Sequence, residues 1–241
     1  TDAVYLKLSG VSHSLGFFHP KTLGAVSLSI FFDCFILFQE LRKQYFTFFL
    51  LTVLYIVYHL TFSRTSILIA GLGLLIYAFR KILSSYVMNK FVFSITTTGL
   101  YLFGMFYSMF YSTSNIFYRQ LDIFLTNRVR LGNMYIQRYG FTLFPKSTPN
   151  IIPQGWWGSD QLFNDNTFLK FALTQGVIIA VLFLLYILYI IGTKEYCLYD
   201  ALLILLTFLF LMIEAQGFYA FLLTPLLFKF MSVRDSSVKQ I

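Results

Sequence analysis

Charged residues are scarce in this chain. Of its 241 residues 12% are charged, 58% are hydrophobic and 20% are aromatic, whereas soluble domains carry roughly 25% charged residues. Hydrophobic runs of roughly 20 residues recur, which is long enough for a helix to cross a hydrocarbon core of ~30 Å. We therefore expect an all-α, polytopic transmembrane helix bundle.

Cysteines and the common catalytic signatures are also rare or missing. Cys34 and Cys197 fall in or beside different hydrophobic runs, so a disulfide is not expected, and no Cys/His metal spacing occurs. The sequence has no phosphate-binding glycine loop and no Ser-His-Asp arrangement. Its net charge of +8 is scattered rather than gathered in a dense patch, which argues against nucleic-acid binding. We expect no cofactor and no metal.

The hydrophobic runs predict about seven membrane spans in a single domain over residues 1–241. They cover about Thr22–Gln39, Tyr45–Phe62, Ile67–Phe79, Phe91–Tyr111, Phe171–Ile191, Leu198–Ile213 and Phe218–Phe230. Basic residues in the short connections all fall on one side if the spans alternate, and that side is the cytoplasm. The chain begins in a polar segment without Met or a signal peptide, so we expect an N-terminally truncated protein that lacks further spans.

The polar stretch over residues 112–170 differs from these runs, and we expect it to form one large extracytoplasmic loop. If residues 115–142 form one helix, apolar side chains share a stripe and Arg128 lies in its middle. Such an arginine either meets a buried anion or belongs to an amphipathic helix that lies among lipid headgroups. An N-cap at Thr126 or Asn127 would start a second helix and break this register.

Two further candidate sites lie at the predicted outer ends of spans. Arg64 could hold an anion in an external cavity, or it could anchor its helix at the membrane interface. Asp165 precedes the fifth span and could take a proton from a hydroxyl. The alternative for Asp165 and Asn166 is helix capping, for which both residue types are suited.

Aromatic and histidine side chains complete the set of candidates. Trp156 and Trp157 could stack on sugars, or they could belong to an interfacial aromatic belt. His19 precedes a proline, where a structural role is the alternative to a catalytic one. Together these residue types suit one reaction, in which arginines bind a departing diphosphate while a carboxylate or histidine deprotonates the attacking hydroxyl.

Four stretches resemble the bacterial polysaccharide polymerases of the Wzy type, within the O-antigen ligase/polymerase group. They are GFFHPKTLG at 16–24, TFSRTSILIA at 61–70, TNRVRLGNMYIQRYGFTLF at 126–144 and DNTFLKFALTQGVI at 165–178. Their order and spacing also resemble the group. Lys21 departs from it where Asn is frequent, and Asp165 departs from the ligase branch, which has His there. The second departure favours a polymerase over a ligase.

The resemblance implies metal-independent glycosyl transfer. Undecaprenyl-diphosphate-linked oligosaccharide repeat units would be joined into a cell-surface or exported polysaccharide at the outer face of the bacterial cytoplasmic membrane. Arg64 and Arg128 would hold the diphosphate, and Asp165 would be the base. Further substrate-contact candidates are Arg130, His19, Asn166, Trp156 and Trp157.

Membrane lipid is an expected partner, and the resemblance adds the flippase and the chain-length regulator of the same pathway. Two other functions stay open. One is an O-antigen ligase-like transferase, which would share the arginines and differ in its acceptor. The other is a flippase or another transporter of lipid-linked oligosaccharides, which would line a path across the membrane with charged residues.

Overall fold

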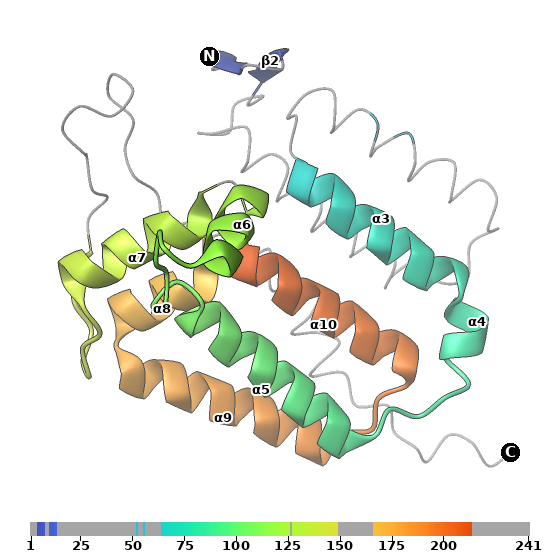
Figure 1. Cartoon of the computed structure of the whole chain (residues 1–241). Helices are drawn as coiled ribbons and strands as arrows, with labels where there is room; N and C mark the ends of the chain where they lie inside the picture. Colours follow the sequence, from blue (N-terminus) through green and yellow to red (C-terminus); the bar gives the residue numbers. More distant parts are fainter. Residues whose placement is uncertain are drawn as a thin grey trace, which may run out of the picture. The chain divides into compact units, whose positions relative to one another are not determined.

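The structure is a computed structural model. It describes residues 4–7, 10–13, 52, 55, 64–125, 127–148 and 166–213, and Figure 1 shows how the elements follow one another. The side chains of the first two strands, of residues 64–66 and of residue 124 lie outside the described part. Within the described residues the protein is mainly helical. The elements are β1 (Val4–Lys7), β2 (Gly10–His13), α3 (Arg64–Ala78), α4 (Arg80–Leu83), α5 (Lys90–Phe106), α6 (Ile116–Phe124), α7 (Arg128–Tyr139), α8 (Thr167–Gln175), α9 (Val177–Thr193) and α10 (Leu198–Ile213).

The chain divides into two compact units. The first holds Thr1–Met88, Ile190–Ile204 and Tyr219–Ile241, and the second holds Asn89–Tyr189 and Leu205–Phe218.

Among its described residues the first unit contains a hairpin, helices α3 and α4, the end of α9 and the start of α10. Strands β1 and β2 pair antiparallel, with Val4 opposite His13 and Lys7 opposite Gly10, inside the polar segment that begins the chain. Helices α3 and α4 follow each other closely, and the Arg80 guanidinium lies 4.5 Å from the Tyr77 ring centroid. It also donates a hydrogen bond of 2.8 Å to the Tyr77 hydroxyl.

A short antiparallel contact joins the end of the α3–α4 region to the start of α10. Val87 pairs with Cys197. The Met88 amide donates to the Tyr196 carbonyl at 2.8 Å, and the Leu198 amide donates to the Tyr86 carbonyl at 2.8 Å. These backbone bonds satisfy polar groups that would otherwise be exposed between helices.

The second unit is packed around aromatic side chains of α5, α8 and α10. The Phe168 ring lies 4.8 Å from the Tyr101 ring and 5.6 Å from the Phe208 ring, measured between centroids. Gly104 permits this packing, because a Cβ there would lie 2.6 Å from Phe168 Cδ2. Tyr101 donates from its hydroxyl to the Ala180 carbonyl at 2.9 Å and so ties α5 to α9. Burial raises the pKa of Tyr101 above its usual range, so this donor stays protonated.

The prediction of a transmembrane bundle is wrong for the part of the chain that the structure describes. None of the helices described is both long enough and apolar enough to cross a membrane. The predicted spans 22–39 and 218–230 lie outside the described residues, and only Thr52 and Tyr55 of the span 45–62 are described.

Two breaks explain why the predicted spans are longer than the helices. The predicted span 171–191 is divided at Gly176, whose φ of +85° ends α8 before α9 begins. The predicted span 91–111 is helical only as far as Phe106, where a turn begins. Helices α5 and α9 are therefore 17 residues long, which at 1.5 Å per residue is about 25 Å.

Candidate functional site

The junction between α6 and α7 positions the arginines of the predicted loop. Of the two arrangements that the sequence left open, one helix over residues 115–142 or a break at Thr126-Asn127, the structure has the second: α6 ends at Phe124 and α7 begins at Arg128. Asn127 has φ +65°, in the left-handed region that Asn tolerates better than most residues. Its amide donates to the Asp122 carbonyl at 2.7 Å, which turns the chain from one helix into the next. The predicted common stripe is therefore wrong, because the two helices have separate registers.

Asp122 caps α7 from the preceding helix. Asn127 makes no side-chain cap, and the Arg130 amide in the first turn of α7 instead donates to Asp122 Oδ1 at 2.9 Å. The Asp122 side chain is 5% exposed. A carboxylate at this position also interacts favourably with the positive end of the helix dipole. Asp122 therefore fixes the turn that carries Arg128 and Arg130.

Arg128 is the first residue of α7 and is buried, with 7% of its surface exposed. Its Nη1 donates to the carbonyl oxygen of Ile213 at 2.6 Å. Ile213 is the last described residue of α10. Arg128 is thus buried, and a backbone carbonyl of another helix is one of its partners.

Small and polar residues hold α7 against the turn that follows α5. Asn133 donates from Nδ2 to the Ser108 carbonyl at 2.9 Å. It accepts at Oδ1 from Gln137 Nε2 at 2.8 Å. One residue earlier, a Cβ on Gly132 would lie 2.8 Å from Ser108 Cβ and 3.0 Å from Leu169 Cδ2. Gly132 lies four residues after Arg128, on the same side of the helix, so this close approach also determines the position of Arg128.

Asn166 is the N-cap of α8. Its Oδ1 accepts from the Leu169 amide at 3.0 Å, and its Nδ2 donates to the Gly104 carbonyl of α5. The side chain is buried. Of the two roles that the sequence leaves open, the structure shows capping for Asn166, and this cap also connects α8 to α5.

The structure brings together some of the predicted residues. Arg128 and Arg130 share the first turn of α7, and Asn166 lies in the same compact unit. Arg64 is the first residue of α3 in the other unit, and its side chain lies outside the described part. Outside the described residues altogether are Asp165, His19, Trp156 and Trp157.

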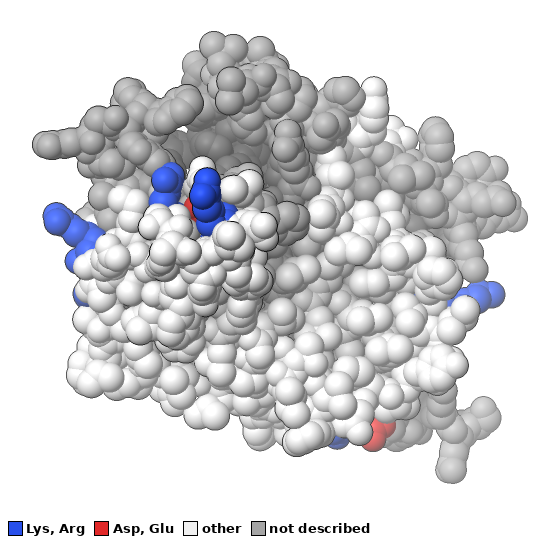
Figure 2. Space-filling model, in the orientation of Figure 1, with Lys and Arg blue, Asp and Glu red and all other residues white. Residues whose placement is uncertain are grey.

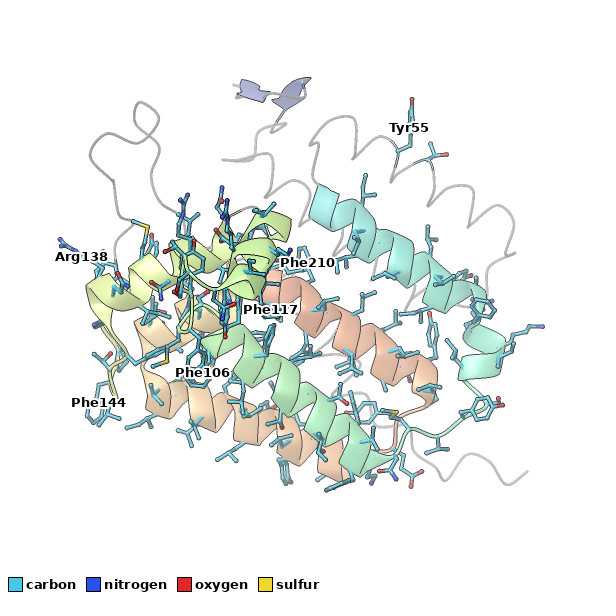
Figure 3. The ribbon with its side chains drawn as sticks, in the orientation of Figure 1. Tyr55, Phe106, Phe117, Arg138, Phe144 and Phe210 are labelled. Atoms are coloured by element: carbon cyan, nitrogen blue, oxygen red, sulfur yellow. The ribbon has the colours of Figure 1, made fainter. Side chains whose placement is uncertain are left out.

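The surface of the second unit over α6 and α7 is basic. Figure 2 shows blue side chains gathered over α6 and α7, with a small red area between them. Figure 3 shows Arg138, in the last turn of α7, directed away from the helices. Guanidinium groups bind phosphate and carboxylate groups in a bidentate way. The arrangement is therefore suited to an anionic ligand.

Asp122, Gly132 and Asn133 were not predicted as parts of this site. Asp122 matters only because the chain turns at 125–127, and the sequence signal for that turn is the Thr126-Asn127 pair. Gly132 could have been noticed from its spacing of four residues after Arg128. Asn133 carries no comparable signal for its contact with the turn after α5, because its partners there are backbone carbonyls distant in sequence.

Comparison of the chain with protein-family models, with curated proteins and with solved structures found no match.

Proposed function

We propose that this protein joins lipid-diphosphate-linked oligosaccharide repeat units into a polysaccharide, by glycosyl transfer that uses no metal. The observation that carries the proposal is the buried Arg128 at the positive end of α7, beside Arg130 in the same turn. A helix N-terminus and two arginines favour an oxygen-rich anion such as a diphosphate.

In this proposal Arg128 and Arg130 bind the diphosphate of the donor and stabilise it as the leaving group. A diphosphate oxygen is a charged acceptor and makes a stronger hydrogen bond with a guanidinium than a neutral carbonyl does. Arg128 can therefore exchange its bond with Ile213 for one with the substrate. Asp122 is a positioning residue, because its carboxylate already accepts the Arg130 amide.

The other roles come from the sequence resemblance. Arg64 is a second diphosphate ligand, and Asp165 is the base that deprotonates the attacking hydroxyl. His19, Trp156 and Trp157 are substrate contacts. The bonds of Asn166 to Leu169 and Gly104 support a structural role for that residue, so we propose that it positions α8 and contacts substrate only secondarily.

The proposed reaction takes place at the outer face of the bacterial cytoplasmic membrane. A substrate that carries a polyprenyl chain is held in the bilayer, since each buried methylene contributes about 0.8 kcal/mol. The flippase that delivers the repeat unit and the regulator that sets the chain length are the proposed partners. The products would be capsular, exported or surface-bound polysaccharide.

The test compares two arginines of the same helix in cells that make and export the repeat unit. Arg128→Ala should abolish long-chain polysaccharide and leave single repeat units, because the diphosphate loses its buried ligand. Arg138→Ala is the matched control, since Arg138 is exposed at the other end of α7, and it should keep normal chain lengths. Thermal unfolding of both variants shows whether each is folded. Normal chain lengths with Arg128→Ala would refute the site.

A further inference from the structure

The segment that follows α7 closes over the junction between α8 and α9. We call residues 141–146 the strap. Val177, the first residue of α9, donates its amide to the Thr142 carbonyl at 2.8 Å. The Lys146 amide donates to the carbonyl of Thr174, in the last turn of α8, at 2.9 Å. The first amides and the last carbonyls of a helix have no partners within it, so the strap supplies partners to both helices at once.

Gly176 allows the strap to approach the junction closely. A Cβ on residue 176 would lie 2.5 Å from the Leu143 carbonyl oxygen and 2.7 Å from the Phe144 carbonyl carbon. The Ile178 amide also faces the strap, 3.4 Å from the Leu143 carbonyl oxygen. The residue that divides α8 from α9 is therefore also the residue against which the strap lies.

The strap also holds the end of α7. Tyr139 is the last residue of α7, and Lys146 donates from Nζ to its carbonyl oxygen. A cation near the C-terminus of a helix is favourable. Helix α7 has 12 residues, and an isolated helix shorter than about 12–15 residues is marginal in water. It therefore depends on contacts at its ends, which Asp122 provides at the first turn and the strap at the last.

The middle of the strap has few buried contacts. Its first residue, Phe141, packs against the Phe106 ring of α5 at 5.8 Å between centroids. The side chains of Leu143 and Phe144 are 62% and 69% exposed, and Pro145 is exposed too. Figure 3 shows Phe144 directed away from the helices. Segments with few buried apolar contacts open at a lower free energy than the core of their protein, so the strap is suited to local opening.

We propose that the strap opens and closes on the α8–α9 junction and thereby controls how firmly α7 holds the Arg128 turn. When the strap is closed, both ends of α7 are fastened. When it is open, the last turn of α7 loses the lysine that bonds to it. The consequence for an anionic ligand rests on the proposed function, because it requires that Arg128 and Arg130 bind the diphosphate. The opening itself does not depend on that function.

The test opens the strap by removing one hydrogen bond. Val177→Pro deletes the amide that bonds to Thr142, and proline is well tolerated at the first position of a helix. Val177→Ala shortens the same side chain and keeps the amide, so it is the matched control. Lys146→Met loosens the strap at its other end, with Lys146→Arg as its control. Amide hydrogen exchange of the full-length variants in detergent is measured by mass spectrometry, and thermal unfolding shows whether each variant is folded.

We expect exchange over residues 136–146 to be several-fold faster in Val177→Pro than in Val177→Ala, with α5 unchanged. The same difference is expected between Lys146→Met and Lys146→Arg, and this pair decides if Val177→Pro does not fold. Faster exchange confined to the start of α9 would overturn the proposal, because the junction would then not be coupled to α7. Equal acceleration in all helices would also overturn it, since the strap would not open as a local unit.

Titration with inorganic pyrophosphate distinguishes this proposal from the proposed function. We expect Val177→Pro to bind pyrophosphate several-fold more weakly than Val177→Ala does. Equal affinities would overturn the link between the strap and Arg128. Absence of binding by every variant and by the unaltered chain would refute the diphosphate site instead, and the exchange rates would still decide whether the strap opens.

Discussion

The close approach of α7 to the turn after α5 makes Gly132 the most informative position for substitution. A Cβ on residue 132 would lie 2.8 Å from Ser108 Cβ and 3.0 Å from Leu169 Cδ2, and both neighbours are fully buried. A Cβ on residue 99, in α5, would have no neighbouring atom within 4 Å. Gly132→Ala and Gly99→Ala are therefore a matched pair of helical substitutions that differ in the space available.

The expected magnitude comes from two opposing effects. Replacing glycine by alanine inside a helix stabilises it by about 1 kcal/mol. Overpacking a tight contact destabilises a protein by roughly 1–3 kcal/mol. Gly99→Ala should show the first effect alone, whereas Gly132→Ala should show both. The difference between the two variants isolates the overpacking and should be about 1–3 kcal/mol, or roughly 2–12 °C in Tm.

Thermal unfolding followed by circular dichroism, with both variants in the same lipid or detergent, measures this difference. Gly132→Ala should also shorten the polysaccharide, because a displaced α7 moves Arg128 away from its position. Gly99→Ala should keep the normal chain length. Equal changes in Tm for the two variants would refute the close packing of α7 at Gly132, and with it the reason that Arg128 is held where it is.

Substitutions at three other positions test single interactions. Asn166→Ala should lower the free energy of unfolding by about 2 kcal/mol in denaturant titration, since it removes a helix cap and a buried hydrogen bond; an unchanged midpoint would contradict this. Asp122→Ala should destabilise the protein by about 1 kcal/mol and reduce polymer length. Asp122→Asn keeps an acceptor for the Arg130 amide, so it should lose less stability and less polymer length than Asp122→Ala does. Burial and the nearby Asp200 raise the pKa of Tyr196 to about 12 from its usual 10.0. The fold therefore loses up to about 3 kcal/mol as pH rises from 10 to 12, and this contribution is intact below pH 10. Tyr196→Phe should remove that part of the pH dependence of Tm, and an unchanged dependence would contradict the assignment.

Hydrophobic runs identified several helices but not where they are interrupted. The predicted segment 198–213 coincides with α10, and the predicted segment 67–79 overlaps α3. Gly176 interrupts another run, where its positive φ ends α8 directly after Gln175. Segments that a hydropathy pattern treats as continuous spans are thus shorter helices in the structure, and the bundle of spans was the wrong expectation.

The sequence indicated the candidate residues of the site. It did not indicate their hydrogen-bond partners, which are backbone groups distant in the sequence. Arg128 was singled out by its place in an apolar stripe, Arg130 by the resemblance, and Asn166 by the resemblance and by its suitability as a helix cap. Their partners were not, since Ile213 and Gly104 take part through carbonyl oxygens that any residue could supply. The break at Thr126-Asn127 was foreseen as an alternative, and it changes which residues lie beside Arg128.

The most direct test of the proposed function uses the full-length protein in vesicles with a polyprenyl-diphosphate-linked oligosaccharide and a metal chelator. Each new glycosidic bond breaks one bond between the sugar and the diphosphate. We predict one polyprenyl diphosphate released for each repeat unit added, measured by mass spectrometry, with this release lost in Arg128→Ala and kept in Arg138→Ala. Movement of intact substrate between the two leaflets without any release of polyprenyl diphosphate would contradict glycosyl transfer and indicate a transporter.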